Sequence, residues 1–132
     1  MELIMNTELA CLAASGALCL ALPLIYLPLY QKQVGTAGLS SNRDAVAEPT
    51  GAAGRGLRAH RNLVENLVPF AIAVLVAHAV GISNGMTAAG ALVFFVARLV
   101  HAVSYLLGII GIRTLAYLGG LVGTALILYQ LV

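Results

Sequence analysis

The segment RAHRNLVE, at 58–65, concentrates polar side chains within an otherwise apolar chain. Its polar members are spaced at i, i+3, i+4 and i+7: Arg58, Arg61, Asn62 and Glu65. In a helix this spacing puts all four on one face. Arginine binds carboxylates bidentately, and a carboxylate such as Glu65 favours an ammonium group. The segment therefore predicts a helix with one polar, largely basic face.

Two further polar groups lie closer to the C-terminus. One group has the spacing i, i+3 and i+7 and again shares a helical face: Arg98, His101 and Tyr105. The other stands at the start of the last apolar run: Arg113, Thr114 and Tyr117. Ionisable residues at membrane depth are costly and usually functional, so all three groups are candidate site residues.

The composition indicates which kind of protein must position these groups. Hydrophobic residues make up 61% of the 132 residues, charged residues make up 9%, and the mean hydropathy is +0.97. Soluble domains carry about 25% charged residues, so a soluble monomer is excluded, as is disorder. The net charge of +2 is too small to indicate nucleic-acid binding. At about 20 apolar residues per span, we predict an all-α integral membrane four-helix bundle forming a single domain, 1–132.

Four apolar runs set the expected elements. We predict helices at about 9–30, 57–80, 86–107 and 114–132. The polar segment 31–56 is rich in glycine and serine and is predicted to be a loop. Pro23 and Pro28 predict a kink late in the first helix. Cys11 and Cys19 lie in an apolar run and are predicted to pack rather than to form a disulfide.

Lysine and arginine predict the orientation in the membrane. The positively charged residues gather in or beside the first and third connections: Lys32, Arg43, Arg55, Arg58, Arg61 and Arg113. Such connections face the cytoplasm. We therefore predict that 31–56 and 108–113 are cytoplasmic and that both termini lie on the opposite side.

The antiparallel helices bring the polar groups to a common level. Glu65 lies roughly 10 Å deeper than Arg58, and Arg98 lies roughly 13 Å from the cytoplasmic end of its helix. We therefore expect a structural ion pair between Glu65 and Arg98 beside a basic, aromatic-lined cavity open to the cytoplasm. Simpler roles remain open. Arg58 and Arg61 also fit anchors that extend to lipid headgroups, and His101 fits a hydrogen bond between helices.

The segments RAHRNLVENLVPF and ARLVHAVSY, with Arg113, Thr114 and Tyr117, resemble the MAPEG family. These are membrane-associated proteins in eicosanoid and glutathione metabolism, and the likeness is to their microsomal prostaglandin E synthases and glutathione transferases. The second-helix motif is the specific part, and the resemblance covers all four spans. It implies a homotrimer with glutathione bound between neighbouring subunits from the cytoplasmic side.

The resemblance also implies roles for individual residues. Six would anchor glutathione: Arg58, Arg61, Asn62, Glu65, His101 and Tyr105. Tyr117 would pack on the peptide, and Arg113, with Thr114 beside it, would stabilise the thiolate. The sequence departs from the prostaglandin synthases in three places. Lys32 replaces an arginine expected at the end of the first helix and would bind glutathione in its stead, and Thr114 replaces a serine. The first loop also lacks a clear counterpart of an acidic residue that assists isomerisation in those synthases, since Asp44 does not align with it.

The chemistry of glutathione agrees with these residues. Its carboxylates suit arginine, its ammonium suits Glu65, and a guanidinium such as that of Arg113 favours the nucleophilic thiolate. We therefore predict a membrane glutathione transferase that acts on hydrophobic electrophiles in detoxification, with lipid hydroperoxide reduction as a further candidate activity. No metal is expected.

The alternatives are a non-catalytic MAPEG-like protein that binds a lipid or partner, and a small four-helix multidrug transporter. Such a transporter needs a carboxylate in its first helix, and 9–30 holds none.

Overall fold

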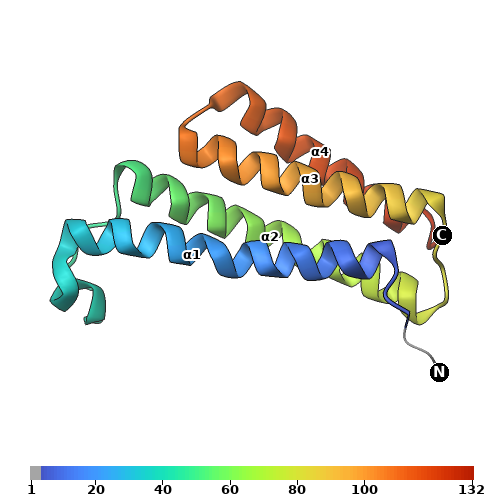
Figure 1. The fold of residues 1–132 in the computed structure, drawn as a ribbon, viewed down its shortest axis with the longest axis horizontal. Coiled ribbons are helices and arrows are strands. Elements are labelled where there is room, and N and C mark those ends of the chain that lie inside the picture. Colours follow the sequence, from blue (N-terminus) through green and yellow to red (C-terminus); the bar gives the residue numbers. More distant parts are fainter. Residues whose placement is uncertain (1–3) are drawn as a thin grey trace.

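The computed structural model describes residues 4–132, which form four helices (Figure 1). The helices are α1 (Thr7–Ser40), α2 (Gly51–Ala79), α3 (Gly85–Leu107) and α4 (Ile110–Tyr129). Each is long and apolar enough to cross a membrane. The predicted all-α, four-helix membrane fold is therefore confirmed.

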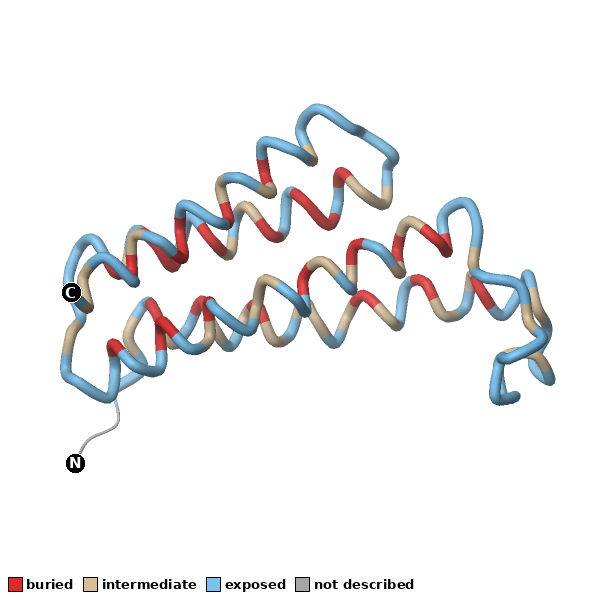
Figure 2. The backbone as a smooth tube through the Cα atoms, turned by 180° about the vertical axis from the view of Figure 1, so that it is seen from behind, coloured by how far each residue is buried: buried red, intermediate tan, exposed pale blue. Residues whose placement is uncertain are grey.

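The helices form two antiparallel pairs, α1 beside α2 and α3 beside α4 (Figure 1). The pairs pack closely where α1 begins and α4 ends, and they diverge toward the α1–α2 and α3–α4 connections. The buried residues follow the facing sides of the helices, and most outward-facing residues are exposed (Figure 2). Leu20 and Leu24 are 76% and 75% exposed, as expected for side chains that contact lipid rather than a protein core.

Aromatic stacking and small side chains hold the two pairs together. The rings of Phe70 on α2 and Phe94 on α3 stack with their centroids 3.7 Å apart, in a fully buried cluster with Ala73 and Ala91. Small residues allow helices in membranes to approach closely, because packing rather than a hydrophobic driving force joins them. The two helix pairs are therefore in contact at this end of the bundle and separate toward the other end.

The predicted bounds of the first loop are wrong, because both flanking helices extend into it. Helical structure continues to Ser40 across a break at Gly35, whose φ of 75° suits a residue without a side chain. At the other end, α2 begins at Gly51 rather than near residue 57. Its early glycines serve packing: a Cβ on Gly56 would lie 2.5 Å from the Cβ of Tyr26. Only the segment 41–50 lies outside both helices.

The segment 41–50 folds back onto the end of α1. The hydroxyl of Tyr30 donates to the carbonyl of Ala47 at 2.9 Å. Gln33 forms two hydrogen bonds with the backbone of Thr50, at 2.9 and 3.1 Å. These contacts tie the last turns of α1 to the start of α2, where Arg61 lines a pocket with Tyr26 and Tyr30 of α1.

Glu8 forms a second polar contact at the opposite end of the bundle. Its carboxylate is 3% exposed and accepts hydrogen bonds from Ser83 Oγ, at 3.0 Å, and from Thr87 Oγ1. Glu8 belongs to the first turn of α1, whereas its donors belong to the α2–α3 connection and to α3. The carboxylate thus joins the beginning of α1 to the beginning of α3.

Candidate functional site

Arg98 lies at the centre of the candidate site. It is 1% exposed and contacts the two helices that flank α3. Its Nη1 donates to Asn62 Oδ1 on α2 at 2.7 Å, and its Nη2 donates to the carbonyl of Tyr117 on α4 at 2.8 Å. Its Nε has no hydrogen-bond partner. A single buried guanidinium therefore links α2, α3 and α4 and keeps one donor unused.

The predicted ion pair between Glu65 and Arg98 does not form within the protomer. Glu65 is exposed on α2, and the guanidinium of Arg98 bonds to Asn62 instead. Glu65 was expected at the level of Arg98 because of its depth along α2. The residue of α2 that faces Arg98 is Asn62, about one helical turn closer to the α1–α2 connection. Asn62 therefore occupies the position that was expected for the carboxylate.

A second layer of the site surrounds the ring of Tyr105. The guanidinium carbon of Arg113 lies 4.4 Å from the centroid of this ring, and that of Arg58 lies 5.8 Å from it. The buried ring of His101 meets Tyr105 edge-on, with centroids 5.4 Å apart. Tyr117 lies beside both layers, with its centroid 6.5 Å from that of His101. Three helices thus direct arginines and aromatic rings to one place.

The electrostatics of this cluster are unbalanced. Glu65 is the sole acidic residue of α2, α3 and α4, and it is exposed. The polar partners of Arg98 are an amide and a carbonyl, and Arg58 and Arg113 both lie over the ring of Tyr105. Burying a charge without a countercharge is costly, particularly at membrane depth. The arrangement is therefore suited to an anionic ligand.

Comparison with models of protein families matches residues 9–132 to the MAPEG family. The chain belongs to the MAPEG family. The resemblance predicted from the second-helix motif is thus confirmed, and with four candidate spans the chain is an integral, multi-pass membrane protein. No curated protein sequence is significantly similar to it. The MAPEG family includes glutathione transferases and related enzymes, and its members typically use glutathione.

The structure brings together most of the residues predicted for a MAPEG site. The converging ones are Arg58, Asn62, Arg98, His101, Tyr105, Arg113 and Tyr117. Others lie apart within the protomer. Lys32 and Thr114 are exposed, and the hydroxyl of Thr114 donates to the carbonyl of Ile110 in its own helix. Arg61 is exposed and faces a pocket against α1. In residues 4–132 no group of three or more His, Cys, Asp or Glu side chains could hold a metal ion.

Three residues that sequence reasoning missed support this MAPEG site. Asn66 Nδ2 donates to the carbonyl of Asn62 at 2.8 Å and lies 3.4 Å from its Oδ1, which orients the amide that binds Arg98. Gly120 makes room for Arg98, since a Cβ there would lie 2.6 Å from Nε. Arg55 Nε donates to the carbonyl of Leu106 at 3.1 Å and fixes the end of α3. The i, i+4 spacing of Asn62 and Asn66 could have indicated their contact from the sequence. The roles of Gly120 and Arg55 depend on how the helices pack and could not be predicted from spacing.

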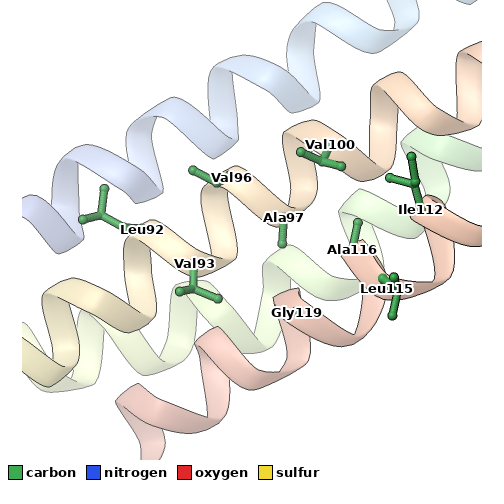
Figure 3. Close-up of a pocket in the computed structure, with 9 residues that line it drawn as sticks. All are labelled: Leu92, Val93, Val96, Ala97, Val100, Ile112, Leu115, Ala116 and Gly119. Atoms are coloured by element: carbon green, nitrogen blue, oxygen red, sulfur yellow. The ribbon is translucent and has the colours of Figure 1, made fainter.

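An apolar groove lies on another side of the α3–α4 pair (Figure 3). Its volume is about 490 Å³, and its lining is Leu92, Val93, Val96, Ala97, Val100, Ile112, Leu115, Ala116 and Gly119. Val96 and Arg98 are two residues apart on α3, so they project about 200° from each other around the helix. The groove and the arginine cluster therefore occupy different sides of this helix.

Proposed function

We propose that this protein is a membrane glutathione transferase, which joins the thiolate of glutathione to a hydrophobic electrophile. The observation that supports this most directly is the buried, uncompensated charge of Arg98. Arg58 and Arg113 add two more guanidinium groups around Tyr105. Two carboxylates of a bound glutathione molecule would supply the missing negative charge. Membership of the MAPEG family favours glutathione over other small anions.

The roles of the residues follow from their positions. Arg98 lies deepest in the cluster, and its neighbours on α2 are Arg58 and Asn62. Arg113 lies in the first turn of α4, over the ring of Tyr105. A nearby guanidinium favours the thiolate over the thiol, and the positive end of the helix dipole adds to that attraction. Arg113 is therefore assigned to stabilising the thiolate. His101, Tyr105 and Tyr117 would pack against the peptide.

The remaining predicted residues would act in an assembly. Glu65, Arg61, Lys32 and Thr114 are exposed on one protomer. In a homotrimer with glutathione between subunits, such exposed side chains are available to a neighbouring copy. Glu65 would then bind the ammonium group, and Thr114 would lie beside the thiolate. A lone protomer would also leave part of the polar cluster facing lipid, which is costly.

The reaction needs little beyond a stabilised thiolate. The sulfur attacks the electrophilic carbon, a carbon–sulfur bond forms, and the leaving group departs with the electron pair of its bond. With a lipid hydroperoxide, the thiolate would attack the terminal oxygen and the O–O bond would break, which gives the sulfenic acid of glutathione and the lipid alcohol. A second glutathione would then react with the sulfenic acid to form the disulfide and water. The apolar substrate would enter from the surrounding lipid.

Glutathione thiolate absorbance tests the proposal. The purified protein in detergent is titrated with glutathione and, as a control, with S-methylglutathione, which has no thiol. We expect a saturable thiolate signal only with glutathione, together with turnover of a model aryl halide. A saturable signal without turnover on any electrophile would support the non-catalytic alternative. Binding without a thiolate signal would contradict the role of Arg113.

The transporter alternative gains no support from Glu8. Although α1 includes this carboxylate, Glu8 lies in the first turn and both of its hydrogen-bond donors are hydroxyl groups of the protein. A proton-coupling carboxylate is expected near the middle of a span, facing a water-filled cavity. The position of Glu8 fits a structural contact instead.

A further inference from the structure

A separate polar pocket lies between α1, α2 and the segment 41–50. Its volume is about 170 Å³. Its lining includes two aromatic rings, two guanidinium groups, one carboxylate and an aliphatic side chain: Tyr26, Tyr30, Arg43, Arg61, Glu48 and Leu57. A ligand pocket usually measures about 300–1,000 Å³. This pocket therefore suits one charged group of a larger molecule whose remainder lies outside.

The two guanidinium groups of the pocket are available to a ligand. Arg43 Nε donates to the carbonyl of Leu39 at 3.2 Å, and its guanidinium carbon lies 5.9 Å from the centroid of the Tyr30 ring. These contacts occupy Nε and one face of the group, so the terminal N–H groups remain. Arg61 is exposed at the same pocket. Two such groups around a small volume match the oxygens of a phosphate or a carboxylate.

The level of the pocket in the membrane identifies the source of that group. Tyr30 is the last residue of the apolar run 9–30, and both pocket tyrosines are buried. Tyrosines with basic residues mark the membrane–water interface, where the phosphates of lipid headgroups lie. In the orientation predicted from the positive charges this pocket lies on the cytoplasmic side, where basic pockets between membrane helices bind lipid headgroups. An interfacial phosphodiester therefore fits better than a free anion in bulk water.

Glu48 restricts which headgroup the pocket accepts. Its carboxylate lines the same small volume as the two arginines. A phosphate alone would be repelled by Glu48, whereas a headgroup that also carries a hydroxyl or ammonium group would donate a hydrogen bond to it. Choline carries no N–H or O–H donor. The combination of charges thus favours glycerol or ethanolamine headgroups over choline.

We infer that this pocket binds the phosphodiester of a membrane phospholipid, with Arg43 and Arg61 on the phosphate and Glu48 on a donor group of the headgroup. The inference goes beyond the proposed function, because the pocket lies on the α1 side of α2 and includes none of the residues around Tyr105. Arg61 is the one residue of this pocket that the family resemblance assigns to glutathione, and the inference replaces that assignment with a lipid phosphate. Competition between glutathione and the lipid decides between the two ligands of Arg61.

Native mass spectrometry of the full chain in detergent tests the inference, with phosphatidylglycerol, phosphatidylethanolamine and phosphatidylcholine added in turn. We expect retention of the first two lipids over the third. Arg43→Asn removes the guanidinium and tolerates the φ of 65° at this position, and it should weaken retention about tenfold. Lys32→Ala removes one exposed charge outside the pocket and should leave retention within about twofold. Glu48→Gln should reduce the preference over phosphatidylcholine.

Several results would overturn the inference. Equal losses in Arg43→Asn and Lys32→Ala would mean general surface attraction. Displacement of the lipid by inorganic phosphate would mean an ordinary anion site, and displacement by glutathione would assign the pocket to the peptide. The thiolate signal keeps this outcome distinct from the proposed function. If Arg43→Asn loses lipid but keeps the thiolate signal, the lipid site is supported as separate from the glutathione site. If lipid is absent from a protein with a normal thiolate signal, the inference alone fails.

Discussion

Two buried charges have different surroundings: Glu8 lies at one end of the bundle, and Arg98 lies at the inner side of the arginine cluster toward the other end. Glu8 is 3% exposed and accepts two hydrogen bonds from hydroxyl groups of the protein. Arg98 is 1% exposed, bonds only to an amide and a carbonyl, and keeps Nε without a partner. Neither side chain has an ion-pair partner among residues 4–132. Arg98 alone keeps a buried polar atom without a partner, and it belongs to a cluster with further guanidinium groups, so the comparison assigns structure to the Glu8 end and binding to the Arg98 end.

The largest expected effect is on turnover, at the Arg98 end. Arg113→Leu removes the guanidinium assigned to the thiolate, and loss of one such stabilising group costs about 100-fold to 1,000-fold in turnover. Glutathione affinity should stay within about tenfold, because the residues proposed to bind the peptide, Arg58 among them, are unchanged in this variant. Stopped-flow absorbance and aryl halide kinetics measure the two quantities separately. Arg58→Leu is the matched control and should weaken binding more than turnover. Wild-type turnover in Arg113→Leu would remove this residue from the chemistry.

At the other end, the effect should be on stability rather than on activity. Glu8→Leu leaves the hydroxyls of Ser83 and Thr87 without their shared acceptor and should lower the free energy of unfolding by about 2 kcal/mol. Glu8→Gln keeps an oxygen acceptor and should cost about half as much. Thermal unfolding in detergent checks both variants. Glutathione affinity should be unchanged when it is measured well below the unfolding temperature. A stable Glu8→Leu variant with altered glutathione binding would reverse the assignment of the two ends.

A smaller loss of stability is expected when the space beside the Arg98 guanidinium is filled. Gly120→Ala places a methyl group against the guanidinium and should destabilise the protein by about 1.5 kcal/mol through overpacking. It should also weaken glutathione binding, because Arg98 must move. Gly119→Ala is the adjacent control, since its Cβ would meet only the Cβ of Ala97, at 3.4 Å. Unfolding and binding measurements on both variants check this prediction. Equal behaviour of the pair would show that the position of Arg98 does not depend on Gly120.

The sequence predicted what depends on local spacing and failed where packing decides. The four spans and the shared face of Arg98, His101 and Tyr105 follow from helical periodicity, and the structure agrees. The contact between Glu8 and Thr87 joins residues 79 positions apart, and no local pattern indicates it. The glycine-rich sequence at the start of α2 suggested a loop. These glycines are helical instead, and Gly56 allows the close approach of Tyr26, a reason that becomes visible only when the helices are packed together. Contacts between side chains of different helices thus could not be predicted, because they depend on how the helices are aligned against one another.

The smallest expected effect tests that register directly. Arg98 bonds to Asn62 and not to Glu65, so a double-mutant cycle should find coupling with only one of them. For Asn62→Leu with Arg98→Leu, we expect a coupling of about 1 kcal/mol in the free energy of unfolding, the typical net contribution of one hydrogen bond. For Glu65→Gln with Arg98→Leu, the two effects should add within about 0.5 kcal/mol. Glutathione must be absent, since a peptide bound to both residues would couple them indirectly. Strong coupling of Glu65 in the free protein would mean that a neighbouring subunit brings this carboxylate to Arg98, and Arg98 would then have the countercharge that the protomer lacks.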